Sequence, residues 1–347
     1  MDQLKINKEI QESLKNWKEI VKKYQVPDTK KAIGQLLNSF LPFIGLWVLM
    51  YFSMEWSILL TIGLGIINAF FLVRIFIIQH DCGHQSFFKS RRWNNAVGYV
   101  CSVFSALPYK YWAKVHNFHH AHSGVLETID IGDIPTLTVE EFRNLSWFGR
   151  VRYKIWRNPI ITFVIAPVYY IALSNKLPLF HFKNWRKEVW SQFKDNILII
   201  IAYGVLGYFI GWKQFFFIQL LLVFVFGIIA FWFFYIQHQH EHSYKQWQDN
   251  WDYVVSAIRG SSYYKLPKVF QWMTGNIGIH HIHHLSSLIP NYNLEKCMKE
   301  NTIFNKYVTV VTFWESLRMM THKLWDEEKQ RMISFKEYYK MEELRLA

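Results

Sequence analysis

The sequence predicts an all-α integral membrane protein with four transmembrane helices in two hairpins and a helical cap on the cytosolic side. Three observations predict this fold class. Hydrophobic residues make up 51% of the chain and aromatic residues 18%, as in membrane proteins that anchor Trp and Tyr at the interface. Four apolar runs each have the length of about 20 residues that a helix needs to cross a bilayer. The basic residues behind the net charge of +13 lie between these runs. We therefore expect one membrane domain over residues 1–347.

The composition also narrows the class of partner and the compartment. Because the basic residues alternate with long apolar runs, the expected partner is an anionic lipid surface and not nucleic acid. The three cysteines, Cys82, Cys101 and Cys297, are scattered and odd in number, which favours reduced thiols over a disulfide framework. The first residues are polar and lysine-rich and show no signal-peptide pattern.

The N-terminal third contains the first hairpin. Residues 1–34 have apolar side chains at helical spacing, and we expect this amphipathic segment to lie on the membrane surface. The first span covers 36–54 and the second 57–79, with a link too short for anything but a tight turn. A second helix that continues to His84 would carry its last turns, with His80, clear of the lipid.

The second hairpin comes late, with spans at 196–212 and 215–236. By the positive-inside rule, the N-terminus, the middle region and the tail after residue 236 lie in the cytosol. Pro159–Leu173 is apolar but short and contains two prolines, so we expect it, like Ala96–Leu107, to be an interfacial or buried helix that does not cross.

Histidines gather in four clusters on the predicted cytosolic side. They read H-D-C-G-H (His80, His84), H-N-F-H-H (His116, His119, His120), Q-H (His238) and H-H-I-H-H (His280, His283, His284). Residues three and four apart share a helix face, so the rings of each cluster could point to a common centre. A His-rich surface helix is the ordinary explanation for one cluster, but two H-x-x-H-H patterns in one chain are rare by chance.

The number and kind of these side chains indicate a redox metal site. A structural zinc needs four ligands and usually takes Cys, whereas eight or nine imidazoles suit two metal ions of higher coordination number. Two iron ions fit this donor set best. An iron pair beside membrane hairpins suggests O2 activation against an apolar substrate, because an unactivated methylene offers no acid, base or leaving group to side-chain chemistry.

The chain resembles the integral membrane fatty acid desaturases. The resemblance rests on the three histidine boxes, their order and their placement after hairpins. It is closest to the bacterial acyl-lipid desaturases in R-I-F-I-I-Q-H-D-C-G-H-Q-S-F-F (74–88), G-S-S-Y-Y-K-L-P-K (260–268) and G-N-I-G-I-H-H-I-H-H-L (275–285). It extends over about residues 33–336.

The resemblance implies an O2-dependent desaturase that inserts a cis double bond into an acyl chain, in the cell membrane, with its active site facing the cytosol. It implies nine metal ligands: His80, His84, His116, His119, His120, His238, His280, His283 and His284. The acyl chain is expected on a membrane phospholipid, although acyl-CoA and acyl carrier protein stay open, as do Δ5 and Δ12 for the position of the double bond. The chain has no flavin, haem or iron–sulfur motif, so a separate electron donor such as a ferredoxin or a flavoprotein reductase is expected.

One departure and several further side chains accompany these ligands. Phe234 stands where animal acyl-CoA desaturases place an Asn that reaches a metal through water, and Asn276 is a candidate substitute. Asp81 could orient His80 or could equally be a helix-surface carboxylate, and His281 is expected to support the ligands or to pack, without binding metal. His122, His240 and His242 flank ligands and could donate hydrogen bonds to them, but we expect them to be solvated. His181 and His322 are expected to be ordinary.

Two other functions compete with desaturation. The first is hydroxylation of an alkyl or sterol substrate by the same kind of iron pair. The second is a membrane metal transporter or sensor, although transporters place polar ligands at the bilayer midplane and the four spans here contain no His.

Overall fold

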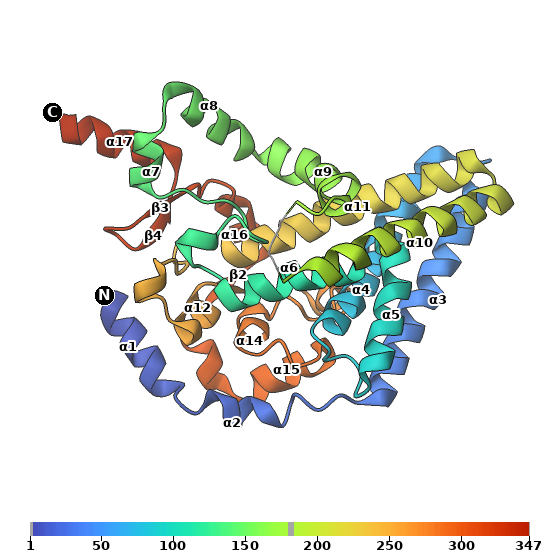
Figure 1. Cartoon of the computed structure of the whole chain (residues 1–347), viewed down its shortest axis with the longest axis horizontal. Helices are drawn as coiled ribbons and strands as arrows, with labels where there is room; N and C mark the ends of the chain where they lie inside the picture. The colour runs from blue at the N-terminus through green and yellow to red at the C-terminus, as the bar shows by residue number, and fades with distance from the viewer. Residues whose placement is uncertain (1–2, 180–183, 347) are drawn as a thin grey trace.

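The computed structural model describes residues 3–179 and 184–346 and consists mostly of helices (Figure 1). The α-helices are α1 (Gln3–Ser13), α2 (Trp17–Lys22), α3 (Thr29–Ser53), α4 (Ile58–Gly83), α5 (Arg91–Ser105), α6 (Tyr109–His122), α7 (Val139–Asn144), α8 (Trp147–Trp156), α9 (Ala166–Ala172), α10 (Arg186–Ile210), α11 (Trp212–His238), α12 (Tyr253–Arg259), α13 (Lys268–Met273), α14 (His280–Leu285), α15 (Asn291–Glu300), α16 (Phe313–Met319) and α17 (Phe335–Leu346). The 3-10 turns are η1 (Leu126–Thr128), η3 (Ser174–Lys176), η4 (Gln248–Asn250) and η5 (Thr302–Asn305), and η2 (Ile161–Ile165) is a π-helical turn.

Within the described residues, strands form two short pairings. Strand β1 (Ser262–Tyr264) runs parallel to β2 (Thr309–Val311), and β3 (Leu324–Asp326) runs antiparallel to β4 (Arg331–Ile333). The all-α class is therefore confirmed apart from these three-residue strands.

The four predicted spans are confirmed as four helices, α3, α4, α10 and α11, that are long and apolar enough to cross a membrane. Helix α3 packs along α4, α10 packs along α11, and α11 also packs on α4. Asp28 caps α3 by accepting hydrogen bonds from the amides of Lys30 and Lys31, and Ser57 caps α4. Helix α10 begins ten residues before the predicted span, since its charged first turns continue the same helix beyond the apolar run.

The two shorter apolar segments form helices of different kinds. Residues 96–105 belong to α5, which packs on α4 and buries Gly98 and Cys101, and the helix ends two residues before the predicted segment does. The segment Pro159–Leu173 lies in η2 and α9, and together with α8 it bends by 56° at a short break. It is therefore not one straight span, as its prolines predict.

The N-terminal segment differs from the prediction. We expected its apolar face to lie on the membrane. Ile10, Leu14 and Val21 are instead buried in a cluster with Val255 of α12 and Leu294 of α15. The amphipathic pattern correctly predicts a buried face. It does not say whether lipid or protein covers that face.

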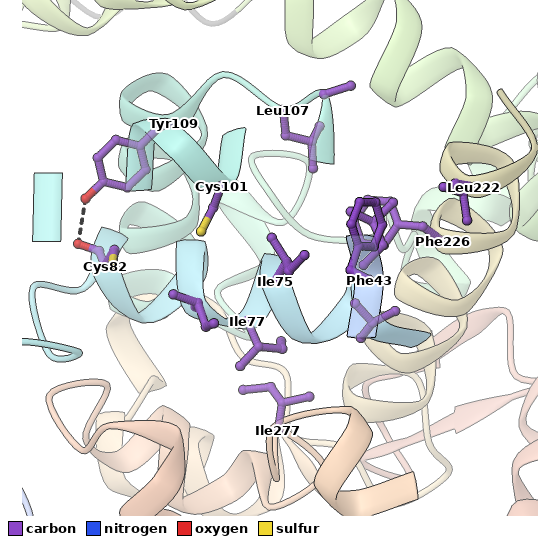
Figure 2. Packing of buried hydrophobic residues seen from close by; sticks show 14 of the residues in the cluster. Phe43, Ile75, Ile77, Cys82, Cys101, Leu107, Tyr109, Leu222, Phe226 and Ile277 are labelled. Carbon is purple, nitrogen blue, oxygen red and sulfur yellow. Dashed lines mark hydrogen bonds between the residues drawn. The ribbon is translucent and has the colours of Figure 1, made fainter. Parts of the chain in front are cut away.

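The largest buried cluster fixes the end of α4 (Figure 2). Ile75 and Ile77 of α4 lie in it together with Phe226 of α11. Gly98 lies so close to the ring of Tyr109 that a Cβ there would be 2.4 Å from ring atoms. This approach lets the Tyr109 hydroxyl donate to the Cys82 carbonyl at 2.7 Å, which ties α6 to the histidine-bearing turn of α4.

Candidate metal centre

The histidine clusters converge from four helices that meet in the middle of the molecule (Figure 1). Helix α4 continues without a break to Gly83 and so carries His80 and, at its C-cap, His84. Helix α6 supplies the second cluster, α11 ends at His238, and α14 supplies the third cluster. Ring centroids of His80 and His283 are 4.5 Å apart, and those of His120 and His284 are 4.1 Å apart. Segments two hundred residues apart in sequence thus build one site.

Five of the nine predicted ligands form a first group. These are His80, His84, His116, His120 and His283, and one ring nitrogen of each lies within 4.8 Å of the others. Three of the four elements contribute to this group, so its assembly depends on the tertiary fold.

The other four predicted ligands form a second group. His119, His238 and His284 each place a ring nitrogen within 4.8 Å of the others. His280 belongs with them, because its Nε2 lies 3.0 Å from Nε2 of His238 and 3.1 Å from Nε2 of His284. The structure therefore places all nine predicted side chains in two adjacent groups of five and four.

Several ring nitrogens in these groups are buried and have no hydrogen-bond donor or acceptor, which suits binding of a metal ion. In the described part of the chain, Nε2 of His80, Nε2 of His84 and both ring nitrogens of His283 are buried with no hydrogen-bond partner. Unpaired buried polar atoms are costly, and a cation between them would remove the cost. Burial also lowers the pKa of His116, His120 and His283 well below its usual value, helped by neighbouring rings. The rings are therefore neutral, the form that binds metals.

Acceptors behind the rings set the orientation of three of them. Nδ1 of His80 lies 2.9 Å from Oδ1 of Asp81, and Nδ1 of His84 lies 2.8 Å from Oδ1 of Asn117. Nδ1 of His238 lies 3.3 Å from the Gly260 carbonyl. Because these oxygens only accept, each Nδ1 carries the hydrogen and each Nε2 keeps a lone pair for a metal.

Asp81 itself accepts two hydrogen bonds from Asn291, the first residue of α15. Its Oδ2 accepts the backbone amide of Asn291 at 2.6 Å and the Asn291 side-chain amide at 2.8 Å. Asn276, the candidate substitute for a water-bridging Asn, points elsewhere: its amide donates to the Asn291 carbonyl at 3.4 Å. It supports the residue that holds Asp81 and does not bond to a histidine.

Phe234, which stands where animal acyl-CoA desaturases place an Asn, lies against the four-histidine group. Its ring centroid lies 5.3 Å from that of His119 and 5.1 Å from that of His238. A phenyl ring thus covers this side of the four-histidine group. The nearest carboxylate to that group, Asp133, lies 3.7 Å from Nδ1 of His119 and has no motif around it that would predict the contact.

The remaining histidines within the described residues lie outside both groups. His122 bonds through Nδ1 to the Phe118 carbonyl, and His242 is exposed as expected. His240 was expected to be solvated, but it is fully buried, two residues after the end of α11. His281 is buried against Asn305, with 3.3 Å between Nε2 and Oδ1, and His181 lies outside the described residues.

Stability is expected to fall in mild acid because of His281. Burial lowers its pKa from 6.5 to about 4, although the bond to Asn305 opposes the shift. The unfolded chain therefore binds a proton on His281 below about pH 6.5 while the folded chain does not, so stability falls as pH drops from there towards about 4. The loss approaches about 1.4 kcal/mol per pH unit for one such ring.

Unfolding of the detergent-solubilised protein as a function of pH tests this expectation. His281→Phe should flatten the acid limb relative to the natural protein, and His242→Ala, at an exposed position, should leave it unchanged. An equally steep limb in His281→Phe would show that His281 does not cause the loss.

Comparisons with known proteins agree with this site. Residues 54–314 match the family model described as fatty acid desaturase. The chain is 41% identical over 311 residues to a fatty acid desaturase of Bacillus subtilis (strain 168), an alignment that covers 89% of this chain and 87% of the relative. It is 26% identical over 334 residues to an sn-1 oleoyl-lipid 12-desaturase of a Picosynechococcus species, with 89% and 88% covered. It is also 26% identical over 277 residues to an sn-1 acyl-lipid omega-3 desaturase (ferredoxin) of a Nostoc species, with 76% and 68% covered.

Proposed function

This chain belongs to the fatty acid desaturase family, and from that premise we propose that it inserts a cis double bond into an acyl chain of membrane phospholipid at a pair of iron ions. It is an oxidoreductase and a membrane protein with four candidate spanning helices. The observation that carries the proposal is the pair of histidine groups. Eight of the nine side chains are buried and His116 is half-buried, and Nε2 of His80, His84 and His283 has no hydrogen-bond partner.

The donor set supports iron as the resident metal. Nine imidazoles without a cysteine suit two ions with five or six ligands each, and they do not suit a tetrahedral zinc. Bound iron would supply the oxidising power that removes hydrogen from adjacent methylenes while O2 is reduced to water. We propose His80, His84, His116, His120 and His283 as ligands of one ion and His119, His238, His280 and His284 as ligands of the other.

The protein's own groups hold this site in place and keep it dry. Asp81, Asn117 and the Gly260 carbonyl fix the ring orientation of three ligands through Nδ1. His80, His84 and His120 are 3%, 6% and 7% exposed, so bulk water is largely kept from the ring nitrogens. A dry, fixed set of ligands favours oxidation of the bound acyl chain over side reactions with solvent.

The substrate, the orientation and the electron donor belong to the same proposal. The names of the cyanobacterial relatives refer to acyl lipids, which supports a phospholipid substrate. The basic residues flank the apolar spans, which supports a site on the cytosolic face of the cell membrane. A relative's name includes ferredoxin, which supports a separate one-electron carrier of that class in preference to a flavoprotein reductase.

Hydroxylation is the main competing reaction, because it differs only in whether a second hydrogen leaves before oxygen is transferred. Mass spectrometry of fatty acids from a host that expresses the chain and lacks its own desaturase distinguishes the two. We expect new acyl chains that have lost two hydrogens, with a cis double bond. New hydroxy acids would favour the hydroxylase, and metal uptake into vesicles with unchanged lipids would favour a transporter.

A further inference from the structure

One predicted ligand, His84, forms a hydrogen bond with an exposed residue of α6. Among the nine histidines, and within the ranges that the structure describes, His84 is the one whose ring bonds to an exposed side chain, that of Asn117. The comparable bonds of His80, His119 and His238 lead to buried groups. The path from solvent to the five-histidine group through Asn117 is therefore short and consists of one side chain, one hydrogen bond and one ring.

Positive charge surrounds this point. The segment 82–122 contains five basic residues and no acidic one, namely Lys89, Arg91, Arg92, Lys110 and Lys114. Lys110, Lys114 and Asn117 are spaced four and three residues apart and so share one face of α6. Lys89 and Arg91 line one hollow together with Gln85, the residue after His84.

Hydrogen bonds connect the two halves of this surface. Asn95 of α5 accepts a hydrogen bond from Lys110 of α6 and another from Gln85 at 3.4 Å. Asn117 donates to the Gly83 carbonyl at 3.4 Å, directly beside His84. We call Lys89, Arg91, Lys110 and Lys114, with Asn117 among them, the α6 basic surface.

The charges of the α6 basic surface are not neutralised within the protein. In the described ranges, none of its four cations forms an ion pair with a carboxylate. Burial and the nearby charge of Arg91 lower the pKa of Lys110 from its usual value. Two acids, Asp195 and Glu188, act on Lys110 through space, but neither forms an ion pair with it. Asp195 is 1% exposed and accepts hydrogen bonds from the backbone of Tyr109 and Lys110, so its carboxylate does not face solvent.

We propose that the α6 basic surface is the docking site of an acidic one-electron carrier of the ferredoxin class, and that electrons enter through Asn117 and His84. This inference rests on the proposed desaturase function and identifies where its partner binds. An acidic carrier complements four unpaired cations, and electrostatic attraction speeds the encounter of small, transient electron-transfer partners.

The electron count gives the carrier its role. Removal of two hydrogens from the acyl chain releases two electrons and two protons. Two further electrons, delivered one at a time by two carriers that become oxidised, and two protons from solvent complete the reduction of one O2 to two waters. A lipid headgroup could also neutralise the cations, but it delivers no electron. A hydrogen bond between exposed Asn117 and a metal ligand therefore favours the carrier as the partner.

Charge reversal tests the docking site in the full-length enzyme, reconstituted in neutral lipid nanodiscs and supplied with reduced plant-type ferredoxin. The variant Lys89→Glu with Arg91→Glu should raise the KM for ferredoxin by about tenfold and weaken its salt dependence. The matched control, Lys15→Glu with Lys18→Glu, changes the net charge equally at exposed residues of the N-terminal segment and should leave KM unchanged.

A second variant tests the route of entry. Asn117→Leu should lower kcat with saturating ferredoxin, expressed per bound iron, while leaving the KM for ferredoxin unchanged. Because Asn117 also orients His84, iron content and single turnover driven by dithionite are measured in the same variant, and the loss with ferredoxin should exceed the loss with dithionite. Single turnover driven by dithionite should proceed at the same rate in the natural protein and in the two charge-reversal variants. Failure of the natural protein to desaturate with either reductant would reject the proposed function itself.

Three results would overturn the docking proposal while leaving desaturation in place. One is an unchanged KM in the Lys89 and Arg91 variant. Another is an equal rise in the Lys15 and Lys18 control. The third is weaker binding of the Lys89 and Arg91 variant to vesicles of anionic phospholipid with ferredoxin kinetics intact, which would assign the α6 basic surface to lipid.

Discussion

His283→Ala is expected to abolish double-bond formation while the protein still inserts into the membrane. The His283 ring lies in the five-histidine group, 4.5 Å from His80 and 4.5 Å from His120 between ring centroids. Its removal takes away a proposed ligand at a position where both ring nitrogens are buried and have no other partner. Loss of a ligand to a redox metal removes the group that carries the chemistry, so we expect activity to fall by at least about a thousandfold.

Fatty acid analysis of membranes from cells expressing the variant measures this effect. His242→Ala is the matched control, because His242 is exposed and outside both histidine groups, and it should produce double bonds at the natural rate. Variants at the other eight proposed ligands should behave like His283→Ala. Robust desaturation after loss of both His84 and His283 would refute the two-metal site.

Replacing Asp81 is expected to have the second largest effect. In Asp81→Leu, His80 loses the acceptor that fixes its ring, and both amide groups of Asn291 lose their partner in a buried place. Each unsatisfied buried donor costs about 1–3 kcal/mol, and loss of the acceptor behind a ligand lowers metal affinity by about 10- to 100-fold. Asp81→Asn keeps one acceptor oxygen and should retain part of both the stability and the affinity.

Iron retention during titration with a chelator separates this positioning role from simple destabilisation. The expected order of retention is natural protein, Asp81→Asn, then Asp81→Leu, at a temperature at which all three remain folded. Equal retention by all three folded proteins would mean that Asp81 supports the fold and does not orient His80.

Much of the architecture follows from strong local signals. The spans are predicted because four long apolar runs have few other stable arrangements. The sequence analysis considers a second helix that continues to His84, and α4 continues to Gly83 with His84 at its C-cap. Composition and spacing also bring out eight of the nine histidines. His238 lies in the weaker Q-H pattern beside His240 and His242, and the family resemblance is what singles it out from them as a ligand.

The division into two groups depends on tertiary structure. His119 and His120 are neighbours in sequence but belong to different groups, because successive helical residues point about 100° apart. Likewise His283 lies with histidines of α4 and α6, whereas His284 lies with His119 of α6 and His238 of α11. Spacing within one helix predicts which rings share a face, but not which ring of another helix they meet.

The supporting side chains are harder to predict than the ligands. Asn117 lies inside the second box, Asn291 follows Pro290, and Asp133 lies in a loop, and each acts through a contact with a distant element. The burial of His240 and the packing of α1 on the cap have the same origin, since a sequence pattern shows that a face is buried but not what buries it.

The central claim is that the two histidine groups bind one iron ion each. The most direct test is metal analysis of the purified protein together with His84→Ala and His238→Ala, one from each group. The account predicts two iron ions per chain in the natural protein and one in each variant, with different iron spectra for the two variants. A single ion in the natural protein, or zinc in place of iron, would contradict it.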